Sequence, residues 1–212
     1  MSFHFIAALL VSFLSGSLPT ALLMGKMKGV DLRKVGSGNI GATNAFRSLG
    51  KGWGIACLII DAFKGWAPAF FFRGEPWIPS PLSQPTWMLI VGLAAIAGHT
   101  FSPWVKFKGG KGVATSLGVF LAVAPIAVLV CFAICATIIG VSGYVSLGSI
   151  TGATLLPILI IIFSPAGGKP WTVIGLTIVL CSFVIWKHRE NIKRLRAGNE
   201  NWIFGEKKAE GN

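Results

Sequence analysis

Residues 113–163 contain no Lys, Arg, Asp or Glu in 51 consecutive positions. Helices on the surface of a soluble protein need charged side chains, so a run of this length is typical of segments that cross a membrane. The composition agrees, because 53% of the residues are apolar and only 12% are charged. A soluble globule and a disordered chain are both disfavoured, which leaves the lipid bilayer as the solvent and partner of this chain.

The charged residues are strongly unbalanced, with 19 Lys and Arg against 7 Asp and Glu and a net charge of +12. Such an excess is compatible with nucleic-acid binding. Here, however, the basic residues form short clusters between apolar runs, as cytoplasmic loops of membrane proteins do. We therefore expect no nucleic-acid partner, and we expect some of these cations to bind anionic substrates.

Neither metal binding nor disulfide bonding is supported by the spacing of cysteine and histidine. All four cysteines lie inside apolar runs, where packing is the favoured role. We expect no metal, no disulfide and no cofactor. The residues in question are Cys57, Cys131, Cys135, Cys181, His4, His99 and His188.

The apolar runs predict an all-α membrane protein with seven transmembrane helices. The basic segments 25–52, 103–112 and 187–212 share one side by the positive-inside rule, which requires three crossings within 113–163. The N-terminus is then outside and the C-terminus inside. One domain is expected over residues 1–202, with a polar tail at 203–212. The expected runs are 3–24, 53–72, 86–101, 113–124, 126–142, about 149–163 and 171–186.

The fourth of these runs, 113–124, is the weakest part of this topology. At 1.5 Å per residue its length is about 18 Å, whereas the hydrocarbon core of a bilayer is about 30 Å thick. This run cannot cross the membrane unaided. An odd number of crossings within 113–163 is nevertheless needed to keep all basic segments on one side.

The segment after the first apolar run reads Gly-Ser-Gly-Asn-Ile-Gly-Ala-Thr-Asn-Ala-Phe-Arg over 36–47. Its glycines permit close backbone approach to a ligand, consecutive amides can form an anion-binding nest, and the arginine adds a fork suited to phosphate. A flexible linker is the alternative, but it does not explain Asn and Arg among the glycines. A Walker loop is excluded because its Gly-Lys-Ser/Thr ending is missing. The expected binding residues are Ser37, Gly38, Asn39, Thr43, Asn44 and Arg47.

A second glycine-rich segment, Lys-Phe-Lys-Gly-Gly-Lys-Gly, occupies 106–112. Lysines beside glycines at the start of a helix describe another oxyanion cradle. A loop that only sets topology explains the lysines but not the glycines. We expect His99, just before this loop, to cap a helix or to pack. The expected binding residues are Lys106, Gly109, Gly110, Lys111 and Gly112.

Two ionisable residues, Asp61 and Lys64, fall within the second apolar run and share one helical face. Ionisable groups at that depth are costly, so they are functional or paired. Two roles stay open. Lys64 binds a substrate phosphate, or the two residues form an ion pair that holds helices in register.

Two more polar segments are predicted to reach the same side of the membrane. In the loop 143–149, Ser146 and Ser149 are both able to contact a ligand, and Ser149 is the candidate binding residue; hydroxyls that bond their own helix are the alternative. The segment 187–200 is predicted to be helical with a polar face. A basic helix on anionic lipid would explain its Lys and Arg but not its other polar residues. The candidates there are His188, Arg189, Asn191 and Glu200.

Three motifs together resemble those of the bacterial acyl-phosphate:glycerol-3-phosphate acyltransferases, the PlsY family. They are the 36–47 segment, Gly-His-Thr-Phe-Ser-Pro followed by Phe-Lys-Gly-Gly-Lys-Gly-Val-Ala-Thr within 98–115, and Lys-His-Arg-Glu-Asn-Ile-Lys-Arg-Leu-Arg-Ala-Gly-Asn-Glu over 187–200. The resemblance covers nearly the whole chain up to Trp202. Two departures are mild: Lys187 stands where Arg is common, and Asn199 where Thr is common.

The resemblance implies transfer of an acyl chain from acyl phosphate to the 1-hydroxyl of glycerol 3-phosphate, which yields 1-acylglycerol 3-phosphate (lysophosphatidate) and phosphate in bacterial phospholipid synthesis. It implies a bacterial inner-membrane enzyme with a cytoplasmic active site and no direct use of acyl carrier protein or CoA. The His-x-x-x-x-Asp motif of other glycerolipid acyltransferases is absent. A small organic-anion transporter is the rival hypothesis, and it predicts polar groups near the midplane and an internal repeat.

The candidate catalytic residues are His188, Asn191 and Ser37. The attacking hydroxyl must lose a proton, and an imidazole with an ordinary pKa of about 6.5 suits a base at neutral pH. The donor phosphate is the competing base, in which case His188 and Asn191 position the hydroxyl. We favour positioning. We expect Ser37 to donate a hydrogen bond rather than to accept the acyl chain, because an activated donor makes a covalent intermediate unnecessary.

Overall fold

The apolar runs of the sequence form helices in the computed structural model, which describes residues 3–74, 77, 81–164 and 170–204. The described part contains no strand, so the expected all-helical class is confirmed. The elements are α1 (Phe3–Ser17), α2 (Thr20–Met27), α3 (Ala42–Leu49), α4 (Lys51–Phe71), α5 (Gln84–Thr100), η1 (Pro103–Val105), α6 (Val113–Val123), α7 (Pro125–Ser142), α8 (Val145–Phe163), α9 (Trp171–Lys187) and α10 (Arg189–Arg196).

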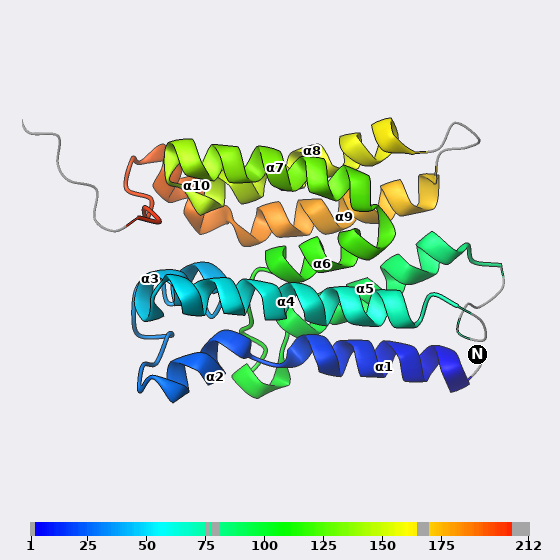
Figure 1. Ribbon diagram of the computed structural model, residues 1–212, viewed down its shortest axis with the longest axis horizontal. Coiled ribbons are helices and arrows are strands. Elements are labelled where there is room, and N and C mark those ends of the chain that lie inside the picture. Colours follow the sequence, from blue (N-terminus) through cyan, green and yellow to red (C-terminus); the bar gives the residue numbers. More distant parts are fainter. Residues whose placement is uncertain (1–2, 75–76, 78–80, 165–169, 205–212) are drawn as a thin grey trace, which may run out of the picture.

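The long helices run side by side and form two groups (Figure 1). Helix α4 contacts α1, α5 and α6, and α8 contacts α7 and α9. The groups join where α6 meets α7 and where α5 meets α9. The short helices α3 and α10 and the turn between α7 and α8 all lie at one end of the molecule (Figure 1). The polar segments of the sequence therefore gather at that end.

Five helical segments are long and apolar enough to cross a membrane, and the pair α9–α10, bent by 56°, is a sixth candidate. Helix α6 has 11 residues, which is about 16 Å at 1.5 Å per residue, and it is too short to span alone. The seven crossings and the side of each terminus stay predictions. The expected tail beyond Phe204, residues 205–212, lies outside the described part.

The helices differ from the expected runs at two places, although Phe3–Met27 still counts as one candidate span. The first apolar run is divided at Leu18 and Pro19 into α1 and α2, because proline has no N–H to continue the helical bonding. Helix α8 begins at Val145 rather than near residue 149, so Ser146 and Ser149 lie on its first turns and not in a loop.

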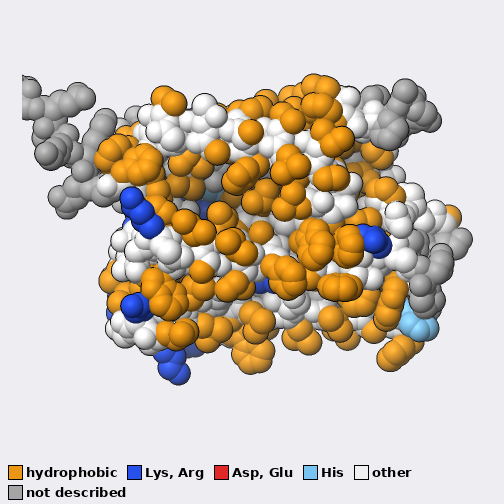
Figure 2. Space-filling model, in the orientation of Figure 1, with side chains coloured by type: hydrophobic (Ala, Val, Ile, Leu, Met, Phe, Trp, Pro, Cys, Tyr) orange, Lys and Arg blue, Asp and Glu red, His pale blue; other side chains and the backbone are white. Residues whose placement is uncertain are grey.

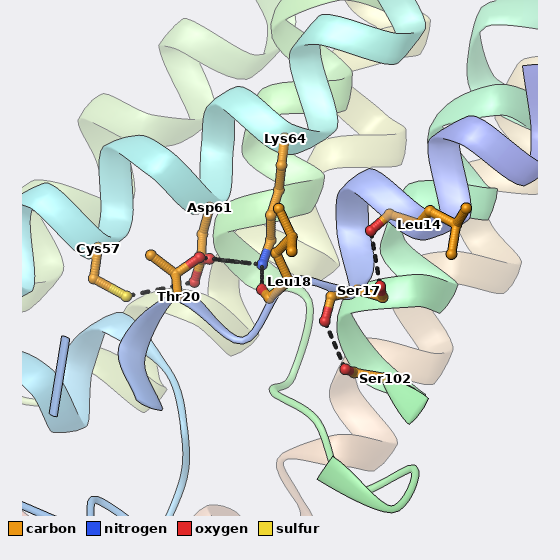
Figure 3. Close-up of polar contacts among 8 residues, drawn as sticks. All are labelled: Leu14, Ser17, Leu18, Thr20, Cys57, Asp61, Lys64 and Ser102. Atoms are coloured by element: carbon orange, nitrogen blue, oxygen red, sulfur yellow. Dashed lines mark hydrogen bonds and ion pairs between the residues drawn. The ribbon is translucent and has the colours of Figure 1, made fainter. Parts of the chain in front are cut away.

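The break between α1 and α2 is stabilised by a buried ion pair on α4 (Figure 3). The Lys64 ammonium lies 2.8 Å from Asp61 Oδ1 and donates to Leu18 O at 2.8 Å, and Thr20 Oγ1 lies at 3.5 Å. A carbonyl freed by a helix break in an apolar medium is costly unless it finds a partner. The Leu18 carbonyl accepts from the Thr20 N–H at 3.0 Å and from Lys64, so the contacts of Lys64 support the ion-pair role.

We predict that Lys64→Ala lowers the unfolding temperature of the detergent-solubilised protein. Removing one partner of a buried pair leaves an uncompensated charge and costs about 3–5 kcal/mol. The double change Asp61→Leu with Lys64→Met is expected to cost less, since it leaves no lone charge. The matched control is Lys193→Ala, whose pair with Glu190 has the same sequence spacing but is exposed. Equal unfolding temperatures for Lys64→Ala and the control would contradict this prediction.

Candidate active site

A cavity of about 850 Å³ lies between α3, α4 and α6 on one side and α7, α8 and α9 on the other. Figure 2 shows the surface hollowed between α7 and α4, with most of the visible Lys and Arg side chains toward the end that carries α3 and α10. Away from that end the lining is apolar, with Phe120, Val128, Leu156 and Leu180 among its residues. One cavity thus has a cationic end and an apolar end.

Most of the residues expected from the sequence line this cavity. Asp61 and His99, expected to be structural, line it as well. The candidates brought together are Ser37, Gly38, Asn39, Thr43, Arg47, Gly109, Lys111, Gly112, Ser149, His188, Arg189, Asn191 and Glu200. The candidates outside the lining are Asn44, Lys64, Lys106 and Gly110.

Asn44 holds the first loop together from within. Its side chain is 1% exposed, and its Oδ1 accepts from the Ser37 N–H at 3.0 Å. Its Nδ2 donates to the carbonyls of Leu32 at 3.0 Å and Val35 at 3.1 Å. The side chain of Asn44 thus holds the loop whose other residues face the cavity, and its contact with substrate stays a prediction.

The other three candidates outside the lining also have structural explanations. Lys64 is paired on α4, as described above. Lys106 is exposed, at a left-handed φ of 53° in the turn after η1. Gly110 lies against His99, since an added Cβ would stand 2.1 Å from His99 Nε2. This glycine therefore makes room for the imidazole, which fits the packing role expected of His99.

A chain of hydrogen bonds joins the second loop to α10. The Lys111 ammonium donates to Asn191 Oδ1. Asn191 Nδ2 donates to Glu200 Oε1 at 2.8 Å, and Glu200 Oε2 pairs with Arg194 Nε at 2.9 Å. The buried Glu200 carboxylate thereby fixes which way the Asn191 amide points.

Arg194 is a cavity residue that the sequence analysis missed. Its spacing from Glu190 is that of a helical i, i+4 pair, yet Glu190 instead lies 3.3 Å from Lys193. Arg194 lies one turn from Asn191, on the same polar face of the helix. This spacing is the sequence signal that could have identified it.

The remaining cation of the first motif, Arg47, faces the C-terminal segment. Its Nη2 donates to Asn201 O at 2.7 Å, and its Nε donates to Trp202 O at 3.2 Å. The guanidinium is about half-buried, and burial lowers its pKa from the usual value. Arg47 therefore connects α3 to residues 201–202 at the edge of the cationic end.

His188 lies at the bend between α9 and α10 and is 3% exposed. Its Nδ1 lies 2.8 Å from Val184 O, and because a carbonyl only accepts, Nδ1 carries the hydrogen and Nε2 keeps a lone pair. Burial, with the Lys111 charge nearby, lowers the pKa of His188 to about 4. The imidazole is therefore neutral at pH 7.

The two serine candidates differ in their surroundings. Ser37 is exposed in the first loop, and its backbone N–H is held by Asn44. The Ser149 hydroxyl donates to Val145 O at 2.9 Å, the bond within its own helix that was the alternative to ligand binding.

Among the described residues, no three His, Cys, Asp or Glu side chains are close enough to hold a metal ion.

Fold and cavity together define a helical integral-membrane protein that can hold an amphiphilic ligand with an anionic head. The apolar end accommodates a hydrocarbon chain. The cations Arg47 and Lys111 and the glycine-rich backbone suit phosphate oxygens. This is the class of protein that the geometry alone supports.

The chain is similar over most of its length to known acyltransferases. The family model of glycerol-3-phosphate acyltransferase matches residues 6–198. A glycerol-3-phosphate acyltransferase of Geobacter sulfurreducens is 45% identical and covers 90% of this chain and 93% of its own length. One of Thermus thermophilus is 42% identical, covering 91% and 92%.

Solved structures agree with these relatives. The crystal structure of PlsY (YgiH), an integral membrane glycerol 3-phosphate acyltransferase, in its glycerol 3-phosphate form aligns with a TM-score of 0.83 at 38% identity, covering 93% of this chain and 94% of that one. Its lysophosphatidic acid form aligns with a TM-score of 0.81 at 37% identity. The chain belongs to the glycerol-3-phosphate acyltransferase family.

We predict that phosphate binding weakens as the pH rises through about 8. Burial lowers the pKa of Lys111 to about 8, so the ammonium is charged below that pH and loses its proton above it. The kcat/KM for a phosphate-bearing substrate should therefore fall on the alkaline side. Lys111→Arg keeps its charge and should remove that decline, whatever its absolute activity. An unchanged alkaline limb in Lys111→Arg would show that another group titrates.

Proposed function

We propose that this chain transfers an acyl chain from acyl phosphate to the 1-hydroxyl of glycerol 3-phosphate, releasing lysophosphatidate and inorganic phosphate. That it is an acyltransferase acting on glycerol 3-phosphate follows from its family. The acyl phosphate donor is the proposed part. The observation that carries the proposal is a single cavity with an apolar end and a cationic, glycine-rich end. Both proposed substrates bear a phosphate, and both phosphates need that end.

The proposed chemistry needs little covalent help from the protein. The glycerol oxygen attacks the acyl carbon, the bond from that carbon to the phosphate oxygen breaks, and phosphate leaves with the electron pair. Because acyl phosphate is already activated, positioning and charge stabilisation suffice. Arg47 and Lys111 would neutralise the two phosphates. Ser37, with no base beside it, would donate a hydrogen bond and would not carry the acyl chain.

The proton of the glycerol hydroxyl has two possible acceptors. His188 presents a lone pair on Nε2, but its pKa of about 4 makes the imidazole a weak base. The phosphate that leaves becomes more basic as its bond breaks. We therefore favour transfer of that proton to the phosphate. His188 Nε2 would accept a hydrogen bond from the neighbouring 2-hydroxyl of glycerol 3-phosphate and so orient the 1-hydroxyl. Asn191, held by Lys111 and Glu200, would complete this positioning.

The membrane placement is also part of this proposal. Seven crossings, with the N-terminus outside and the C-terminus inside, put every basic loop on one side, which for a bacterial enzyme is the cytoplasmic face of the inner membrane. One domain would then span residues 1–202. Water-soluble glycerol 3-phosphate would reach the cationic end directly, and the acyl chain would enter from the bilayer. No direct contact with acyl carrier protein or CoA is needed.

The rival transporter hypothesis relied on Asp61 and Lys64 as intramembrane charges. These residues pair with each other, and Lys64 also caps Leu18. Their contacts therefore favour a structural role.

The deciding assay supplies the purified protein with acyl phosphate and labelled glycerol 3-phosphate. Labelled lysophosphatidate with release of phosphate supports the proposed donor. Product formed only from acyl-CoA or acyl carrier protein would overturn it.

We predict that Arg47→Ala lowers kcat/KM by about 30-fold or more. Loss of one partner of a desolvated charge-assisted contact costs on the order of 2–5 kcal/mol. The control is Arg33→Ala, because Arg33 is exposed and pairs with Asp31 outside the cavity lining. Near-normal activity of Arg47→Ala at low substrate concentration would remove Arg47 from the phosphate site.

We predict a modest loss for His188→Gln and a severe loss for Asn191→Ala, because the first change can preserve a hydrogen bond and the second breaks the amide contacts to Lys111 and Glu200. The measurement is kcat across pH with both substrates saturating. A loss of about 10³-fold or more in His188→Gln, together with disappearance of the acidic limb, would instead identify His188 as the base.

A further inference from the structure

Ser146, on the first turn of α8, has a buried hydroxyl that no described residue accepts or donates to. The residue is 6% exposed and lines the cavity. Its neighbours along α7 and α8 behave differently. The hydroxyls of Ser142, Ser149 and Thr154 each donate to the carbonyl four residues earlier, at 2.6, 2.9 and 3.0 Å. The free hydroxyl of Ser146 therefore needs an explanation.

The explanation is that other donors occupy the carbonyls behind it. A serine inside a helix usually bonds the carbonyl three or four residues earlier. Ser146 is the second residue of α8, so the carbonyls three and four residues earlier belong to Gly143 and Ser142 in the turn before that helix. Trp202 Nε1 donates to Ser142 O at 3.2 Å, and the Ile203 N–H donates to Gly143 O at 2.8 Å. These contacts dock the C-terminal segment on the α7–α8 turn.

Gly143 makes this docking possible. Its φ is +75°, and a Cβ built there would stand 1.6 Å from Trp202 Nε1. Only a glycine leaves space for the indole against the turn. The same segment accepts both Arg47 hydrogen bonds through the carbonyls of Asn201 and Trp202. The turn that carries Ser146 therefore adjoins the cationic end of the cavity.

A hydroxyl in this position is suited to an anionic oxygen. It stands at the N-terminus of a 19-residue helix, where free backbone N–H groups and the helix dipole favour negative charge. A buried hydroxyl without a partner is unfavourable, so a ligand that accepts its hydrogen bond gains binding energy. Phosphate oxygens are the acceptors that the proposed reaction brings to this end.

We propose that the Ser146 hydroxyl donates a hydrogen bond to a phosphate oxygen of a bound substrate. Trp202 is the positioning residue that keeps this hydroxyl available, because its indole occupies the carbonyl of Ser142. This inference rests on the proposed function, since it requires a phosphate-bearing ligand in the cavity. It adds Ser146 and residues 202–203 to the site, and residues 202–203 lie beyond the part of the chain that the family model matches.

The first test measures steady-state kinetics of Ser146→Ala with each substrate varied in turn, and the inhibition constant of inorganic phosphate. A hydrogen bond to a charged group is worth about tenfold or more in binding. We expect the KM of one phosphate-bearing substrate and the inhibition constant to rise by that factor, with a smaller change in kcat. Ser146→Thr keeps a hydroxyl and should recover part of the loss.

The matched control is Thr154→Ala, which removes an exposed hydroxyl that bonds within the same helix and should leave the kinetics unchanged. Wild-type enzyme is assayed in the same preparation. Its failure with acyl phosphate would refute the proposed donor, whereas normal wild-type activity beside an unchanged Ser146→Ala would refute this inference alone. Equal thermal unfolding of the variants separates a binding defect from misfolding.

The second test addresses Trp202. Trp202→Phe removes the indole N–H, so the Ser142 carbonyl becomes free and the Ser146 hydroxyl can turn back to it. We expect the same rise in KM as in Ser146→Ala, and little further effect when the two changes are combined. The control, Asn199→Ala, alters an exposed side chain on the same segment. Fully additive effects of Ser146→Ala and Trp202→Phe would overturn the positioning role of Trp202.

Discussion

A polar group buried in a bilayer must find its partner within the protein, and this requirement explains where the chain departs from simple helices. At the division between α1 and α2, Lys64 bonds the Leu18 carbonyl and the Ser102 hydroxyl bonds the Ser17 carbonyl at 2.6 Å. Partners on α4 and after α5 therefore offset the free-energy cost of the break. Beyond this break α2 still packs against α4 and α3, and the first loop follows it.

The same requirement gives the cationic end its rigidity. Lys111, Asn191, Glu200 and Arg194 form a chain of contacts in which each charge has a partner before any substrate arrives. In low-dielectric surroundings such contacts are strong, and removing one member leaves another unpaired. The network joins the second loop to α10, two segments far apart in the sequence. The proposed phosphate site therefore consists of groups whose positions are already fixed in the free protein.

Hydropathy and loop chemistry were enough to predict the helical class and the polar segments that line the cavity, because both depend on local composition. The partners of individual side chains were not predictable in this way. Asn44 was expected to bind a ligand, and no local pattern indicates that its amide bonds the carbonyls of Leu32 and Val35. Lys64 had two open roles, and its contacts with Asp61 and Leu18 favour the ion pair. Such outcomes depend on three-dimensional proximity.

Substrate binding should change the electrostatics that these partners establish. In the free protein, burial lowers the pKa of both His188 and Lys111, and the Lys111 charge lowers that of His188 further. A bound phosphate dianion places negative charge beside both groups and therefore raises both pKa values. Lys111 then remains an ammonium while it holds the phosphate. The His188 imidazole gains basicity only in the complex, so there its Nε2 would be a better acceptor for the 2-hydroxyl of glycerol 3-phosphate, while it stays unprotonated in the empty cavity.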